Sequence, residues 1–476
     1  MSSNNPHISN DSNDGLYLYG SGEMDQLSPL KENNEDSEIN ETKNPLKIPI
    51  HFINVSEKIK KIQCGQMFTM ILSTFGNVYT FGCADNGALG HEESIPAKKV
   101  DLNFKAIGIS GGDCHGLCYS KNNLAFWGQF RNSQGPMGES ITNPKYIEKI
   151  NFGFQNIKKV VSGTNHVIIL TEEGNIYSFG NKEFGQLGIK DTDDNDYNEL
   201  KIYKINENNV LDIFSGDEHS FLLQKNESGE KMLKGWGLNN KGQVGIGTYA
   251  TEENTNVNVL IPTKINIPDN LIVKKCVGGN GISACITENN VVFCWGYNED
   301  NLLGMDCDDI IISSPKEFQF FNREKVDDIF ATYLYFYAIN KENNNVYSWG
   351  MGESYVLGNR KEKQEQKPYL IKSAFYKNLK VTDISLGCSH VAVVLKQDNT
   401  ILENNKNQEE EVVSKKPTTV VEFGVQKRKN DRSSGEVINE NVDENIGGLK
   451  GICVKEEFIK LNIEDKPKVK KVRHTY

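Results

Sequence analysis

Short apolar runs alternate with polar turns along most of the chain, and seven of these runs end in an aromatic residue followed by glycine. They read LYLYG, NVYTFG, LAFWG, NIYSFG, KGWG, VVFCWG and NVYSWG, with the final glycines at Gly20, Gly82, Gly128, Gly180, Gly237, Gly296 and Gly350. The period is roughly 55 residues, which is typical of a repeat architecture. The pattern therefore predicts one repeated unit built from short strands.

Two further landmarks accompany each aromatic-glycine run. Each run is followed by a Leu-Gly pair or a close variant of it. The last residue of this pair lies eight positions after the glycine of the run in six copies, and ten positions after it in the Gly128 copy. Upstream, a glycine and two variable residues precede a histidine or another large residue, as in GGDCH, SGTNH, SGDEH and LGCSH. Turns such as TEEGN and KENNN join the strands, and their Gly and Asn residues suit tight hairpins. Each unit is thus expected to be a set of antiparallel strands.

A single unit is too small to bury both of its faces, so the seven units must pack on one another. Units of this size do so most simply as a propeller. The chain starts with an aromatic-glycine strand and its last repeat ends at HVAVVL, so each end holds half of a unit. We predict an all-β, seven-bladed propeller over residues 15–400, closed by the N-terminal strand. Residues 1–14 are expected to be disordered, and residues 401–476 to form a mobile tail of mixed charge.

Composition and charge narrow the class of protein. The net charge is -11 and the tail is close to neutral, so the body is acidic and does not favour broad contact with nucleic acid. No apolar run is long enough to span a membrane, and no secretion signal is visible, so we expect no membrane partner. Cys114 and Cys118 share a strand face and offer a metal site as one reading, but buried free thiols are the preferred one.

Motifs of covalent catalysis are missing from the chain. It has no phosphate-binding G-x-x-x-x-G-K-[ST] loop, no H-E-x-x-H and no nucleophile elbow, and we expect no cofactor. His115, His166, His219 and His390 occupy the same repeat position, and the simplest interpretation is that each caps a turn in its own blade. Polar neighbours of these residues, such as Asp113 and Glu218, would then decorate one face of the ring. Such a face suits the docking of a macromolecule.

The tail carries two basic clusters. One has the spacing of a two-part nuclear import signal, and the other is KPKVKKVR at residues 466–473. Such clusters also arise by chance in lysine-rich tails, but two in one tail favour a nuclear protein that binds an import receptor. The first cluster consists of Lys415, Lys416, Lys427, Arg428 and Lys429.

With its three landmarks, the chain resembles the regulator of chromosome condensation family, whose members include nuclear guanine-nucleotide exchange factors for the small GTPase Ran. The landmarks alone indicate only the superfamily. Three stretches resemble the Ran exchange factors themselves: YTFGCADNGALG, FWGQFRNSQGPMG and YSWGMGESYVLG. The resemblance implies a Ran exchange factor in the nucleus, with chromatin and histones as further candidate partners.

The long copy, FWGQFRNSQGPMG, is the most specific of these stretches. In the family its extra residues form a β-wedge that presses against the GTPase near its phosphate-binding loop. By this resemblance Arg131 and Asn132 act in nucleotide release. The remaining wedge residues would bind the GTPase: Phe130, Ser133, Gln134, Gly135, Pro136 and Met137. A merely longer surface loop is the alternative reading.

Other positions carry over from the family one by one. Asp113 matches an aspartate that is important for exchange, and Asn165 replaces a second such aspartate. Glu23, Lys190 and His390 are implied to bind the GTPase. A histidine of the family is missing in the fifth blade, where GGNGI places Gly281 and Ile282. A non-catalytic propeller adaptor and an exchange factor for another small GTPase therefore stay open as alternative functions.

Overall fold

The computed structural model describes residues 15–27, 41–49, 57–92, 94, 97–138, 148–150, 156–190, 200–371 and 379–397. The chain separates into one compact unit at residues 1–414 and a second at 415–476. The predictions for residues 1–14 and 401–476, including both basic clusters, lie outside the described residues. No helix in the part that is described is long and apolar enough to cross a membrane.

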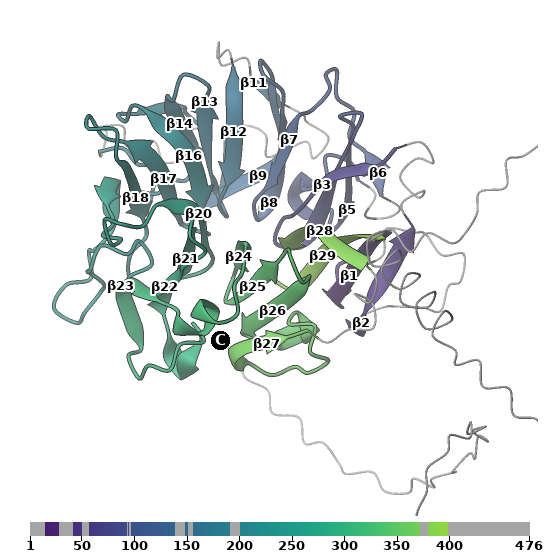
Figure 1. Cartoon of the computed structure of the whole chain (residues 1–476). Coiled ribbons are helices and arrows are strands. Elements are labelled where there is room, and N and C mark those ends of the chain that lie inside the picture. The colour runs from purple at the N-terminus through teal and green to yellow at the C-terminus, as the bar shows by residue number, and fades with distance from the viewer. Residues whose placement is uncertain are drawn as a thin grey trace, which may run out of the picture. The chain divides into compact units, whose positions relative to one another are not determined.

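The described part of the first unit is a ring of seven antiparallel sheets, which confirms the predicted propeller (Figure 1). The innermost strand of each blade is given first. Blade 1 is β3 (Ile59–Cys64), β4 (Phe68–Ser73), β5 (Val78–Gly82) and β6 (Lys98–Lys99). Blade 2 is β7 (Gly108–Gly111), β8 (Cys114–Tyr119) and β9 (Leu124–Asn132), with β10 (Gly135–Met137) and β11 (Glu148–Ile150) both paired to β9. Blade 3 is β12 (Ile157–Ser162), β13 (His166–Thr171), β14 (Ile176–Gly180) and β15 (Tyr203–Ile205).

The remaining blades follow the same order. Blade 4 is β16 (Val210–Ser215), β17 (His219–Lys225), β18 (Lys231–Gly237) and β19 (Val259–Lys264). Blade 5 is β20 (Val273–Gly278), β21 (Ile282–Thr287), β22 (Val292–Tyr297) and β23 (Ile311–Glu317). Blade 6 is β24 (Asp328–Thr332), β25 (Tyr335–Asn340), β26 (Asn345–Gly350) and β27 (Glu365–Leu370). Short 3-10 turns are η2 (Asp85–Gly87), η4 (Glu299–Asn301), η5 (Gln319–Asn322) and η6 (Glu353–Tyr355).

Blade 7 joins the two ends of the repeat region, as the sequence predicts. Its order is β28 (Leu379–Leu386), β29 (His390–Gln397), β1 (Gly15–Ser21) and β2 (Glu41–Pro49). Strands β1 and β29 are antiparallel, with Tyr17 opposite Val393 and Gly20 opposite His390. Every residue of β1 is buried, so this strand is part of the core and leaves no open edge on either side.

The aromatic and Leu-Gly landmarks join neighbouring blades. The Trp127 indole Nε1 of blade 2 donates to the Ala88 carbonyl of blade 1 at 2.8 Å. A Cβ atom on Gly90 would lie 3.1 Å from the Trp127 ring, so only a glycine lets that ring close over the turn comfortably. The same indole-to-carbonyl bond recurs at Trp236, Trp295 and Trp349. The spacing between the landmarks is therefore set by contacts between blades.

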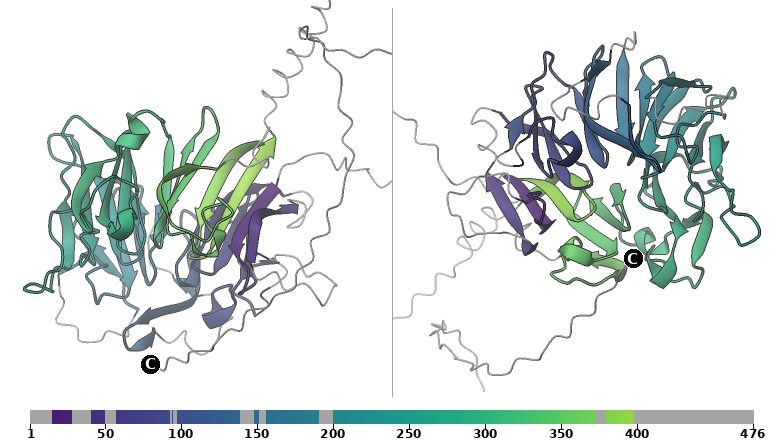
Figure 2. Two further views of the ribbon diagram at one scale, coloured as in Figure 1. Left: turned by 90° about the horizontal axis from the view of Figure 1, so that it is seen from below. Right: turned by 180° about the vertical axis from the view of Figure 1, so that it is seen from behind.

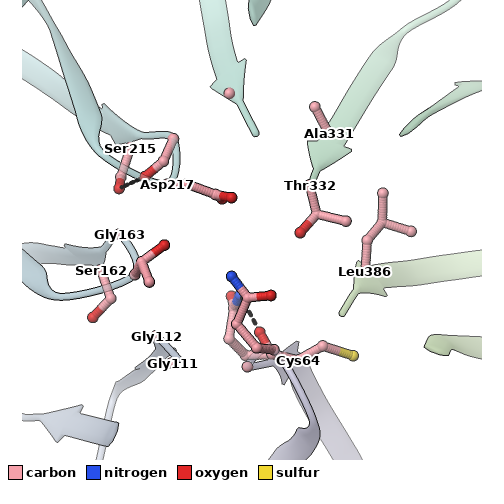
Figure 3. Close-up of a pocket in the computed structure, with 16 residues that line it drawn as sticks. Cys64, Gly111, Gly112, Ser162, Gly163, Ser215, Asp217, Ala331, Thr332 and Leu386 are labelled. Atoms are coloured by element: carbon pink, nitrogen blue, oxygen red, sulfur yellow. Dashed lines mark hydrogen bonds between the residues drawn. The ribbon is translucent and has the colours of Figure 1, made fainter. Parts of the chain in front are cut away.

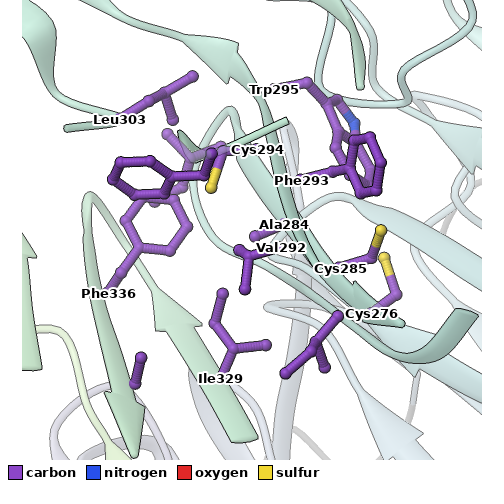
Figure 4. Close-up of a cluster of buried hydrophobic side chains, with 14 of the residues drawn as sticks. Cys276, Ala284, Cys285, Val292, Phe293, Cys294, Trp295, Leu303, Ile329 and Phe336 are labelled. Carbon is purple, nitrogen blue, oxygen red and sulfur yellow. The ribbon is translucent and has the colours of Figure 1, made fainter. Parts of the chain in front are cut away.

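The core lies within and between the blades. Figure 4 shows one part of it, where Leu303 and Phe336 lie on one side of blade 5 and Trp295 lies on the other. Cys285 is fully buried there, and burial raises the pKa of its thiol. All nine cysteines in the described residues are free, and five of them are buried. No group of three or more His, Cys, Asp or Glu side chains in that part of the chain is placed to hold a metal ion.

Candidate functional site

The long repeat copy forms a hairpin where the other blades have a tight turn. In blades 1, 5 and 6, the segment after the aromatic-glycine pair closes in a three-residue 3-10 turn. In blade 2, β9 instead continues to Asn132 and returns as β10, with Arg131 opposite Pro136 and Phe130 opposite Met137. We call residues 130–137 the wedge. It runs beyond the end of β8, at Cys114, and so projects on the side of the Gly-x-x-His turns (Figure 2). We call this side the wedge face.

The base of the wedge is held in the core. Phe130 is fully buried and its ring stacks on His115 with centroids 4.0 Å apart. It also packs edge-on against Phe126 and Phe179 at 5.5 and 5.4 Å. Met137 takes the place of the leucine in the Leu-Gly landmark and is 1% exposed. The expectation that these two residues bind a GTPase directly is therefore corrected, because both side chains are covered and serve to anchor the hairpin.

The tip of the wedge is open to solvent. Arg131, Ser133, Gln134 and Pro136 are exposed, while Asn132 and Gly135 are partly covered. The Asn132 side-chain oxygen accepts a hydrogen bond from the Gln134 backbone N–H at 2.9 Å, which closes the turn. Gly135 has a φ of 125°, a conformation that favours glycine. The tip thus offers one guanidinium and several hydrogen-bonding groups on a shaped turn.

Two residues of blade 3 tether the wedge. The Asn165 side-chain oxygen accepts from the Arg131 backbone N–H at 2.9 Å. The Glu183 carboxylate accepts from the Ser133 backbone N–H at 2.9 Å and from the Ser133 hydroxyl. The Asn165 side chain is therefore bound to the backbone of the wedge and is not free to contact a partner through that oxygen. The sequence reasoning missed Glu183, and the only signal was its place beside the fourth Leu-Gly landmark.

The four repeat histidines cap the turns of their own blades and also link neighbouring blades. The backbone carbonyl of each accepts a hydrogen bond from the turn glycine three residues earlier at 2.8 to 2.9 Å, and its ring lies over that glycine. Each Nε2 atom pairs with a hydroxyl of the next blade at 2.7 to 3.3 Å. All four are buried, and burial lowers their pKa to about 3, or about 4 for His390, so they are neutral. His390 is 0% exposed, which corrects its expected contact with a GTPase. The pairs are His115–Ser162, His166–Ser220, His219–Ser283 and His390–Thr69.

Carboxylates gather where the propeller axis opens on the wedge face. A cavity of about 120 Å³ lies there, lined by the glycines of the Gly-x-x-His turns and by Asp217 (Figure 3). Burial and the nearby charge of Asp113 raise the pKa of Asp217 to about 7. Burial and Asp217 raise the pKa of Glu218 to about 8, although its carboxylate accepts a hydrogen bond from Gln186 at 2.9 Å. Asp113, Asp217 and Glu218 therefore lie close enough on the wedge face for their charges to interact.

The remaining expected site residues are spread around the same face. Asp113 is partly exposed in the turn before β8, and its backbone N–H donates to Thr164 at 3.0 Å. Glu23, just after β1, and Lys190, after the Leu-Gly landmark of blade 3, are both exposed. In the fifth blade Ile282 fills the histidine position and is fully buried. That position belongs to the core, so its loss changes the link between blades and not the exposed surface.

Comparison with known proteins identifies the family of this chain and several relatives. The model of the RCC1-like domain matches residues 15–393. The regulator of chromosome condensation of Homo sapiens is 27% identical over 416 residues, covering 82% of this chain and 93% of that protein. The guanine nucleotide exchange factor SRM1 of Saccharomyces cerevisiae is 26% identical over 396 residues, covering 72% and 79%. The ultraviolet-B receptor UVR8 of Arabidopsis thaliana is 27% identical over 311 residues, covering 63% and 67%, so members of the family differ in function.

Solved structures support the fold. A crystal structure of Prp20p from Saccharomyces cerevisiae, reported with its binding to Gsp1p and histones, superposes with a TM-score of 0.72 at 24% identity. It covers 85% of this chain and 96% of that one. At this level of identity the likeness establishes the architecture alone. Taken with the match over residues 15–393, these findings place the chain in the RCC1-like domain family.

Proposed function

We propose that this protein is a guanine-nucleotide exchange factor for the small GTPase Ran. The observation that carries the proposal is the wedge, an exposed hairpin tip on a base that is locked into the core by Phe130. Relatives named as regulators of chromosome condensation and as an exchange factor support the general activity. Ran as the partner and the wedge as the acting part are inferences from resemblance and geometry.

The task of such a factor sets the energy scale. A nucleotide bound with a dissociation constant near 1 pM is held by about 16 kcal/mol. An exchange factor breaks no covalent bond, because it has only to bind the empty GTPase better than the loaded one, so that each ligand weakens the other. A barrier lowered by about 7 kcal/mol corresponds to release that is about 10⁵-fold faster.

A rigid protrusion suits this task. The ring presents a broad face for docking, and the wedge adds a feature that a loaded GTPase can accommodate only by moving its phosphate-binding elements. Arg131 offers a planar guanidinium to acidic or carbonyl groups, and Asn132 holds the turn. Because Phe130 and Met137 are fixed in the core, a force on the tip is resisted by the blade and not absorbed by a loose loop.

The wedge is tested by release of a fluorescent GDP analogue from Ran. Arg131→Ala with Asn132→Ala, or deletion of Ser133 and Gln134, is expected to slow release at least tenfold. Glu299→Ala is the matched control, since Glu299 is exposed on the corresponding turn of blade 5. Unchanged release in the wedge variants would show that the wedge is only a longer loop.

A pull-down separates exchange from the alternative functions. An exchange factor for Ran is expected to retain nucleotide-free Ran much better than GTP-loaded Ran. An adaptor would bind both forms equally or neither. An exchange factor for another GTPase would ignore Ran and still accelerate release from its own partner.

The basic clusters extend the proposal to location. We infer that the protein enters the nucleus with an import receptor bound to the tail, and that chromatin or histones are partners there. Crystals of Kap60 bound to yeast Prp20, and the histone binding described for Prp20p, support this by analogy. Replacing the first cluster with alanine should shift a fluorescent fusion to the cytoplasm. The residues to replace are Lys415, Lys416, Lys427, Arg428 and Lys429.

A further inference from the structure

A second and larger cavity lies on the propeller axis, at the end opposite to the wedge face. Its volume is about 390 Å³, within the range of small-molecule sites. Its lining begins near the first residues of the inner strands and runs along them, whereas the cavity on the wedge face is lined only near their ends. Both linings include Gln63, Ser162 and Ser215. Four lysines line it, and only two carboxylates do. The lysines are Lys61, Lys159, Lys275 and Lys341, and the carboxylates are Asp328 and Asp383.

The charged residues of this cavity come from one repeated position. In five inner strands the pairing shifts by one residue just before this position, as between Ile59 and Lys61 in β3. Such a bulge re-aims the side chain that follows it. Around the ring, from blade 1 to blade 7, the position is Lys61, Gly108, Lys159, Asp212, Lys275, Asp328 and Asp383. The three lysines thus approach the axis from alternate blades.

Two of the three lysines are bonded to an aspartate of the next blade. Lys159 pairs with Asp212 at 2.7 Å, and Lys275 pairs with Asp328 at 2.7 Å. The Lys341 Nζ atom also lies 3.4 Å from the Asp328 carboxylate, so this carboxylate is shared by two lysines. The ring position of blade 2, between Lys61 and Lys159, is a glycine and adds no carboxylate.

Lys61 is the exception in the ring. It has no hydrogen bond or salt bridge to any residue that the structure describes. The carboxylate nearest to it in the ring, Asp383, accepts from the Ile62 backbone N–H at 2.8 Å. Desolvation lowers the pKa of Lys61, Asp383 opposes that shift, and the charges of Lys159 and Lys275 add to it. Lys61 is exposed and lines the same cavity as Lys159 and Lys275, and its ammonium group makes no direct bond to a carboxylate.

We propose that this cavity binds a small anion with two or more phosphate groups, held by Lys61, Lys159 and Lys275. Lysine ammonium groups bind phosphate as point charges, and three of them at separate positions around the axis suit separate phosphate groups. The hydroxyl of Ser110 also lines the space, and it accepts from the Ser162 backbone N–H, which leaves its own proton to donate. This site is independent of the wedge and of the exchange activity.

Calorimetry on the full chain at physiological salt tests the proposal, with inorganic tripolyphosphate as the main probe. Pyrophosphate, sulfate and citrate at matched ionic strength are the comparisons. We expect saturable binding of one tripolyphosphate per chain, weaker binding of pyrophosphate, and little or none of sulfate or citrate.

Variants place the probe in the cavity. Lys61→Gln is expected to weaken tripolyphosphate binding at least tenfold, and Lys61 has no bonded partner whose loss would disturb folding. Lys60→Gln is the matched control, since Lys60 is the neighbouring residue, bonds to the Ile107 carbonyl at 3.2 Å and does not line the cavity. Lys275→Gln should also weaken binding, with Asp328 still paired to Lys341.

Three outcomes would overturn the proposal. They are no saturable binding of any phosphate probe, equal affinity in the wild type and Lys61→Gln, and tighter binding of citrate than of tripolyphosphate. Thermal unfolding of each variant without the probe checks that its fold is intact. Nucleotide release from Ran should be the same in Lys61→Gln and the wild type, so a failure of the proposed exchange activity would leave this test unaffected.

Discussion

The tether between Glu183 and the wedge gives the sharpest test of how the hairpin acts. The ladder of β9 and β10 has only three residue pairs, and one of them includes Pro136, which has no N–H to donate. The wedge therefore depends on its contacts with blade 3 to hold one shape. We predict that Glu183→Ala impairs exchange although Glu183 belongs to a different blade from the wedge.

The size of the effect follows from the two bonds to Ser133, from its N–H at 2.9 Å and from its hydroxyl. Hydrogen bonds to a charged group contribute about 1.5 to 3 kcal/mol, and solvent at this exposed turn reduces the total to about 1 to 2 kcal/mol. Such a loss shifts the balance between the ordered and the frayed wedge by about 5- to 30-fold. The rate of nucleotide release at limiting protein should fall by at most that factor, because it follows the fraction of protein whose wedge is ordered.

Release of a fluorescent nucleotide from Ran measures the exchange activity of each variant, and thermal unfolding measures its stability. Release should slow in Glu183→Ala and recover in part in Glu183→Gln, whose amide retains one acceptor and one donor. The unfolding temperature should be nearly unchanged in both variants. Glu173→Ala is the control, because that carboxylate accepts from Asn156 at 2.9 Å at the other end of the same blade. Equal release rates in the wild type and Glu183→Ala would refute the idea that the tether orders the wedge.

Three further predictions concern stability. Phe130→Ala should lower the free energy of unfolding, measured by urea denaturation, by about 3 to 4 kcal/mol, because it leaves a cavity at a fully buried site. The same variant should also slow nucleotide exchange. Trp295→Phe should cost about 1 to 2 kcal/mol, because it removes the 2.9 Å bond to the Gln243 carbonyl, and a cost near zero would contradict the role of these indoles between blades. The pKa of Asp217 is raised to about 7, so its burial costs stability as the pH rises from about 4 to 7. Relative to the wild type, Asp217→Asn should therefore gain about 1 to 2 kcal/mol between pH 5 and pH 8, whereas Asp101→Asn, at an exposed carboxylate, should not.

The repeat made the architecture predictable from sequence. Strand periodicity, turn residues and a fixed spacing predicted seven blades, and the half units at the two ends predicted the pairing of β1 with β29. The wedge was also visible as the one copy with two additional residues, because the other six keep one spacing, and in four of them the landmark packs against a tryptophan of the next blade. These features repeat along the chain, so a local pattern carries them.

The roles of individual residues were less predictable, because they depend on which blade lies next to which. Phe130, Met137 and His390 belong to motifs that suggested a binding surface, yet the structure buries all three. Glu183 carried no recognisable motif, and only its contact with Ser133 gives it a part in the candidate site.

The sequence by itself determined the number of blades, the position of the wedge and the closure of the ring, since each follows from a pattern that is local or periodic. Tertiary structure alone decided which polar side chains meet. The link between Asn165 and Arg131 joins residues of two blades, and the ring of charges around Lys61 joins residues from six. Hydrogen bonds and Coulomb interactions depend on distances of a few ångströms in space, and these distances cannot be read from the separation of two residues along the chain.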